Sequence, residues 1–169
     1  MYRTRDFIFM DAVNLSGNLL GFVSDIILNF NNKIVQGFVI TPNSLFKKNL
    51  NVFLEDVVSF ASVIVVTDTN RKKFLQFSDI KGMNVVDKKG HLIGIVEDIL
   101  FHKNTFLIKA LILSTGFISN FIDGKKIVLI DNLILGENNL LYRGESDNLK
   151  FFNSPHKLFD LEEDENYKI

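Results

Sequence analysis

Apolar and polar residues alternate with a period of two over two long stretches of this chain. Leucine, glycine, valine and aspartate recur at every second position, at Leu19, Gly21, Val23 and Asp25, and 73 residues later at Leu92, Gly94, Val96 and Asp98. A period of two is typical of a strand with one buried face. The alternation therefore predicts one strand from Leu19 and another from Leu92, with these positions on the same face.

Shorter apolar runs, rich in β-branched and aromatic residues, follow each of these strands. They cover residues 34–41, 50–54, 57–60 and 63–67 in the first half, and 106–114, 126–130, 133–135 and 140–143 in the second. Turns that contain asparagine and glycine separate them. Short strands at this density predict an all-β fold built from barrels or sandwiches.

The two halves repeat one sequence pattern. Residues 6–40 align without a gap with residues 79–113, and ten of the 35 positions are identical. Two copies of one fold are the natural interpretation. The predicted organisation is a first repeat at 1–67, a polar linker at 68–78, a second repeat at 79–145 and an acidic tail at 146–169.

Four glycines have predicted structural roles. Gly17 and Gly90 each stand fourth in a turn that opens with asparagine or aspartate, where a positive φ is needed and glycine supplies it at low cost. Gly21 and Gly94 lie inside the predicted strands. A glycine there favours a β-bulge, or a corner where a small barrel bends.

One stretch of the second half carries a longer motif. It reads KGMNVVD at 81–87 and GHLIGIVEDIL at 90–100. This stretch resembles the PRC-barrel domain family, and the first half resembles it less closely because Phe9 stands where the second half has Gly82. The resemblance implies a small β-barrel of about six strands that serves as a docking or assembly module, with no catalysis of its own. The fold class expected is therefore all-β, with two small β-barrels in tandem.

Composition narrows the function classes. Of the 169 residues, 47% are hydrophobic and 23% are charged, which is the balance of a globular chain. The net charge of −1 argues against a strongly basic nucleic-acid binder. With no cysteine and three histidines, neither a thiolate site nor a structural zinc site is expected. We expect no metal and no cofactor.

No segment has the length of a membrane helix. The Val-rich uncharged stretch at 57–67 is about half of the roughly 18 residues that such a helix requires, and the longest uncharged stretches, such as 110–122, have only 13. The apolar run near the start, at 7–10, is shorter than the core of a signal peptide. The sequence therefore predicts a soluble, cytoplasmic protein without a membrane span.

The tail at 146–169 differs in composition from the two repeats. It holds six acidic and three basic residues, so its net charge is −3. Ser154 followed by Pro155 is typical of a helix N-cap and first helical position. A short helix is predicted there, with its C-terminal end frayed because the acidic residues oppose the helix dipole.

The repeated carboxylates Asp25 and Asp98 are the first candidates for chemistry. A repeat preserves structural residues first, which favours strand-end carboxylates bonded to turn amides over a site used twice. The adjacent acidic pairs at 55–56 and 97–98 would point to opposite faces of a strand. Each histidine stands alone in sequence. No nucleophile, base and oxyanion donor come together, so we expect a protein that is not an enzyme.

A cluster of large apolar residues lies in the loop at 114–126. The spacing i, i+1, i+4, i+5 places the cluster on one face of a helical turn. Large apolar groups on a loop are normally covered, either by packing across the two barrels or by a partner protein or second subunit. The residues predicted to make this contact are Phe117, Ile118, Phe121 and Ile122.

These observations together predict a non-enzymatic adaptor or assembly module that binds another protein through a barrel face or a loop. The alternative is a factor associated with RNA or ribosome maturation, because the family includes a ribosome-maturation factor and pairs of basic residues lie in predicted loops. The two repeats without the tail carry a net charge of only +2. This low charge argues against tight nucleic-acid binding.

Overall fold

The structure, a computed structural model, describes residues 1–44, 46–115, 125–144 and 151–152. It contains two compact units. The N-terminal unit comprises Tyr2–Ile80 together with Phe101–Ile108, and the C-terminal unit comprises Met1, Lys81–Leu100 and the described residues from Lys109 onward. Each unit is built around one β-sheet, so the all-β class predicted from the sequence is confirmed.

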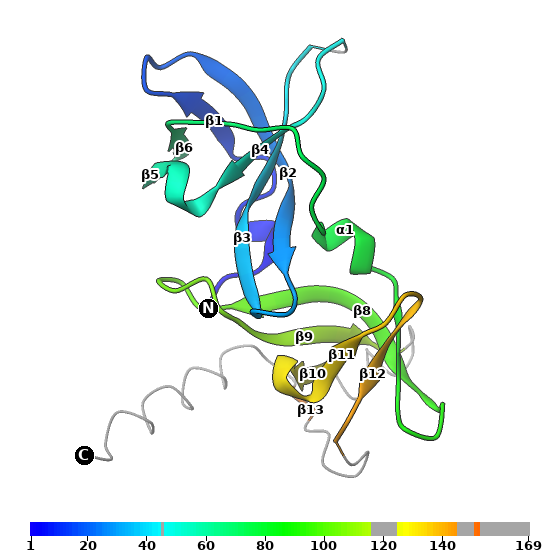
Figure 1. The fold of residues 1–169 in the computed structure, drawn as a ribbon. Coiled ribbons are helices and arrows are strands. Elements are labelled where there is room, and N and C mark those ends of the chain that lie inside the picture. Colours follow the sequence, from blue (N-terminus) through cyan, green and yellow to red (C-terminus); the bar gives the residue numbers. More distant parts are fainter. Residues whose placement is uncertain (45, 116–124, 145–150, 153–169) are drawn as a thin grey trace, which may run out of the picture. The chain divides into compact units, whose positions relative to one another are not determined.

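The N-terminal unit holds a six-stranded sheet in the order β4-β3-β2-β1-β6-β5, drawn in blue to teal in Figure 1. Its strands are β1 (Asp11–Asn14), β2 (Leu19–Asn29), β3 (Ile34–Thr41), β4 (Leu50–Phe53), β5 (Val57–Phe60) and β6 (Val63–Val66). Neighbouring strands are antiparallel except β1 and β6, which are parallel. Three short helices complete the unit: η1 (Thr4–Asp6), η2 (Leu54–Asp56) and α1 (Phe77–Ile80).

The C-terminal unit repeats this strand order and adds one strand. Its sheet has the order β11-β12-β7-β8-β9-β10-β13. The strands are β7 (Asn84–Val86), β8 (Leu92–Phe101), β9 (Ile108–Ser114), β10 (Lys125–Leu129), β11 (Leu133–Leu135), β12 (Asn139–Tyr142) and β13 (Phe151–Phe152), and η3 (Ile130–Asn132) separates β10 from β11. The sheet order therefore supports the duplication seen in the sequence.

The expectation of closed barrels needs a correction. In the described residues, backbone pairing leaves both sheets open, with β4 and β5 as the edges of the first sheet. Only η2 separates these two edge strands along the chain. The first sheet therefore curls until its edges are one helical turn apart, and the chain itself rather than a hydrogen-bonded ladder bridges them.

A β-bulge interrupts the pairing of β1 with β2. Ala12 lies opposite Gly21 and Val13 lies opposite Leu19, so Leu20 is the extra residue. A Cβ atom added at Gly21 would collide with the carbonyl oxygen of Thr41, which explains why glycine is required here. The same bulge recurs in the C-terminal unit, just before Gly94.

Aromatic side chains fill the core of the N-terminal unit. The ring of Phe7 lies 4.9 Å from that of Phe38 and 5.9 Å from that of Phe101, measured between centroids. Phe106 lies 5.5 Å from Phe60. Because Phe101 and Phe106 belong to the tip of the β8–β9 hairpin, this tip completes the core of the N-terminal unit.

The segment 68–78, predicted to be a linker, is also part of the N-terminal unit. Asn70 exchanges two backbone hydrogen bonds with Asn51 on β4, of 2.7 and 2.9 Å. Further along, the Leu28 amide donates to the carbonyl oxygen of Leu75 at 2.8 Å. These bonds hold the segment against the sheet that precedes it in sequence.

The C-terminal unit has an aliphatic core. Leu100, Ala110, Ile112 and Ile127 form a buried cluster, and Met1 packs against it. Of the predicted acidic tail, only β13 is described, and it pairs with Lys125 and Lys126 on β10. The helix predicted after Ser154 lies outside the described residues.

Candidate protein-interaction face

The first sheet displays a row of aligned side chains on its outer face, which is the face opposite the buried Ala12 and Ile64. Direct pairing across four neighbouring strands aligns the members of this row, Ser59, Val65, Val13 and Leu19. We call it the Leu19 row. Leu19 is 51% exposed. Val13 and Val65 are partly exposed, so the row brings three apolar side chains together on one face of the sheet.

The bulge at Leu20 is the reason why Leu19 faces outward. Gly21 and Val23, further along β2, are buried. Strict alternation would place Leu19 on their side of the sheet, as the sequence predicts. One extra residue in the strand reverses the face of everything before it. The prediction that Leu19 shares the buried face is therefore wrong, and the same holds for Leu92, which is 60% exposed.

Phe9 lies next to Phe22 of β2, in a strained conformation. Its φ is +71°, in the left-handed region that favours glycine. Its amide donates to the carbonyl oxygen of Val23 at 2.9 Å, which fixes the backbone. The side chain is 77% exposed, and its ring lies 5.9 Å from the ring of Phe22. A large aromatic residue is thus held on the surface where its backbone is unfavourable.

A single carboxylate lies within this apolar surface. Asp11 is exposed and lies directly opposite Phe22 on β2 and Val63 on β6. Val13 follows on the same face of β1. In the part of the chain that the structure describes, the Asp11 carboxylate has no hydrogen-bond or ion-pair partner. We define the first-sheet face as the Leu19 row together with Phe9, Asp11, Phe22 and Val63.

The C-terminal unit carries the same row with different surroundings. Ile134, Leu141, Val86 and Leu92 align across β11, β12, β7 and β8. Two features of the first-sheet face are missing at the equivalent positions. Gly82 replaces Phe9, with a φ of +85°, and Asn84 replaces Asp11. The aromatic side chain and the charge are therefore specific to the first copy.

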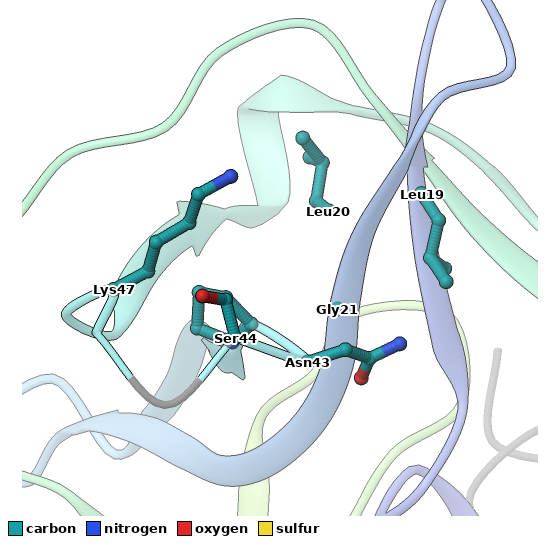
Figure 2. A pocket seen from close by; sticks show the side chains of 7 residues that line it. Leu19, Leu20, Gly21, Asn43, Ser44 and Lys47 are labelled. Carbon is teal, nitrogen blue, oxygen red and sulfur yellow. The ribbon is translucent and has the colours of Figure 1, made fainter.

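A small pocket adjoins the Leu19 row (Figure 2). Its volume is about 300 Å³, at the lower end of the range for small-molecule sites. Figure 2 shows the Lys47 side chain extending into the space beside Leu20. The residues that line it are Leu19, Leu20, Gly21, Pro42, Asn43, Ser44 and Lys47. This mixture of apolar and amino groups extends the first-sheet face toward the β3–β4 loop.

The repeated carboxylates are buried in the sheets, away from this face. Asp25 is 8% exposed. Its Oδ1 accepts a hydrogen bond from the Ile26 amide at 2.7 Å, and its Oδ2 accepts one from the Ser78 amide, in α1, at 3.2 Å. Asp98, 6% exposed, accepts the Ile99 amide at 2.9 Å. This geometry fits carboxylates that fix the backbone.

The two β-turns of the repeat use equivalent side chains. Gly17 and Gly90 have φ values of +78° and +83°. In the second turn, Asp87 Oδ1 accepts the amides of Lys89 and His91, each at 2.8 Å, and Asp87 Oδ2 lies 3.1 Å from His91 Nδ1. Burial would raise the pKa of Asp87, but the two amides and the imidazole outweigh it and lower the pKa below its ordinary value.

The predicted contact residues Phe117, Ile118, Phe121 and Ile122 lie outside the described residues. The matching loop of the first copy is described except for residue 45, and its Phe46 is 97% exposed.

Among the described residues, no group of three or more histidine, aspartate or glutamate side chains is placed to hold a metal ion. In those same residues, no helix has the length and apolar character needed to cross a membrane.

Sequence reasoning missed the first-sheet face for two reasons. The bulge hid Leu19 and Leu92 among residues expected to be buried. Phe9 stood out only as a departure from glycine, and its exposure could not be read from the sequence. The available signal was the combination of a glycine position of the repeat with a large aromatic residue.

Comparison with known families agrees with this architecture. Residues 72–133 match the PRC-barrel domain family. The match covers β7 to β10 and reaches the start of β11, and the first copy has the same strand order as these elements. No curated protein matches the chain in sequence. The chain therefore contains a PRC-barrel domain, and its two sheets are barrel-like units in tandem.

Proposed function

We propose that this chain is a non-enzymatic, cytoplasmic adaptor that binds another protein through the first-sheet face. PRC-barrel domains are of the protein-interaction and assembly type. An adaptor needs a rigid surface with apolar side chains that are free to be covered. The Leu19 row provides such a surface, because sheet pairing fixes the spacing of its side chains.

The observation that carries this proposal is the conformation of Phe9. At φ +71° a residue with a Cβ atom is strained, and the ring of Phe9 stays 77% exposed with Phe22 as its ring neighbour. Strained backbone conformations cluster at binding and active sites, which supports a functional role for this exposed ring. Aromatic side chains are also enriched among residues that dominate protein–protein binding.

The test is co-purification from a native lysate with two matched variants. Leu19→Asp places a charge in the first-sheet face, and Leu92→Asp places the same charge in the equivalent row of the C-terminal unit. Both leucines are at least half exposed, at 51% and 60%, so neither change should unfold the protein. We expect a specific protein to be recovered with the parent and Leu92→Asp, and to be lost with Leu19→Asp.

Nuclease and salt treatments complete the experiment. Recovery of the partner that resists both supports direct protein binding. Recovery that disappears on nuclease treatment and falls steeply with salt would favour the RNA-associated alternative. Loss of the partner with Leu92→Asp but not with Leu19→Asp would assign the function to the other unit.

A further inference from the structure

The position of Asp11 indicates what kind of partner the first-sheet face accepts, provided that the proposed function is correct. Its carboxylate lies between Phe22 and Val63, the residues directly opposite it on the two neighbouring strands. Directly opposite side chains in a sheet have Cβ atoms about 4.5–5.5 Å apart. Any protein that covers these apolar neighbours must therefore also cover the carboxylate.

Covering a carboxylate is unfavourable unless a cation pairs with it. Removing an ionised group from water costs several kcal/mol, and the cost is recovered only with an opposite charge and good hydrogen bonds. Among the described residues, no side chain of the chain itself pairs with Asp11. Since no described residue supplies the compensating charge, we assign it to the partner.

The second copy offers an internal comparison. Asn84 takes the position of Asp11 there, opposite Ile95 and Asn139. The sheet thus accepts an uncharged amide at this position. The fold of the repeat therefore does not require a charge at this position, which is consistent with a role of Asp11 in recognition.

We propose that the partner places a lysine or arginine side chain on Asp11 and apolar side chains on Phe9, Phe22 and Leu19. The partner segment is thus basic at one position and apolar on either side of it. Phe22 and Phe9, with ring centroids 5.9 Å apart, form an aromatic surface next to the carboxylate. Such a surface also favours a cation, because aromatic rings attract a positive charge to their faces.

A library of random 12-residue peptides displayed on phage tests the proposal on the full chain. We expect the enriched peptides to carry a lysine or arginine flanked by apolar residues. Synthetic peptides of the enriched sequence should bind the Asp11→Asn variant about 30-fold more weakly than the parent, since a buried charge pair loses one partner. Asn84→Asp is the matched control and should leave the affinity unchanged.

A second substitution identifies the paired group. Replacing the basic residue of the peptide by glutamine should weaken binding to the parent but cause little further loss with Asp11→Asn. Peptides that lack a basic residue, or whose affinity is the same for Asp11→Asn, would overturn the proposal. If such peptides still fail to bind Leu19→Asp, the first-sheet face remains a binding surface and only the cation is wrong. A library without any peptide sensitive to Leu19→Asp would refute both.

Discussion

Replacing Phe9 by glycine and by alanine separates the strain of this residue from the contacts of its ring. At φ +71° a residue with a Cβ atom is less stable by about 1–2 kcal/mol than in an ordinary conformation. Glycine avoids this strain but loses about 0.5–1 kcal/mol more conformational entropy on folding. The difference leaves glycine favoured over alanine by about 0.5–1 kcal/mol.

The ring itself contributes little to folding. It is 77% exposed, and its one ring contact in the described residues, with Phe22, is worth about 0.5–1.5 kcal/mol. Phe9→Ala loses this contact and keeps the backbone strain. Phe9→Gly also loses the contact, but it is relieved of the strain. We therefore expect the free energy of unfolding of Phe9→Gly to differ from that of the parent by no more than about 1 kcal/mol. Phe9→Ala should be the less stable of the two variants.

Urea unfolding followed by circular dichroism measures these differences, with the midpoint and the slope compared among variants. Gly82→Ala is the converse control. Its φ is +85° and no atom lies within 4 Å of an added Cβ, so the variant should lose about 1 kcal/mol through conformation alone. Equal stability of Phe9→Ala and Phe9→Gly, or no loss in Gly82→Ala, would refute the reasoning. Phe9→Gly should also bind the partner more weakly.

Two further predictions concern buried and turn carboxylates. Asp25→Ala should lower the free energy of unfolding by about 2–4 kcal/mol, because the amides of Ile26 and Ser78 lose their acceptor. A loss below about 0.5 kcal/mol in urea unfolding would show that the carboxylate does not support the fold. The pKa of Asp87 is lowered by folding, so its ionised form stabilises the protein above its ordinary pKa, and this stability is lost as the pH falls through the folded value. The stability difference between the parent and Asp87→Asn should therefore be present at neutral pH and shrink below about pH 4, and a difference independent of pH would contradict it.

Local patterns explain which parts of the fold could be predicted from the sequence. Strand alternation depends only on neighbouring residues, and the turn at Gly17 depends on one backbone conformation that glycine adopts readily. Both appear directly in the sequence. The bulge at Leu20 also has a local signal in Gly21, but its position along the strand decides which side Leu19 faces. That position depends on pairing with β1 and could not be read from β2 alone.

Other features depend on residues distant in sequence. Phe101 lies in the second repeat by alignment, yet its ring packs on Phe7 of the first. No periodicity distinguishes a hairpin tip that stays with its own repeat from one that completes another core. The exposure of Phe9 is equally non-local, since it depends on which strands surround it. The candidate face therefore emerged from the structure, although each of its residues lies in a segment whose type was predicted.

The place of the β8–β9 hairpin tip has a consequence for how the protein is made. When only the first repeat has emerged from the ribosome, the nascent chain contains Phe7, Phe38 and Phe60. It still lacks Phe101 and Phe106, which complete this aromatic cluster. The nascent chain must keep these aromatic side chains from other contacts until synthesis has passed residue 108. Such a delay exposes apolar surface to aggregation and slows folding through distant contacts. A fragment cut at the end of the first repeat should therefore be poorly soluble, even though the sequence repeat ends there.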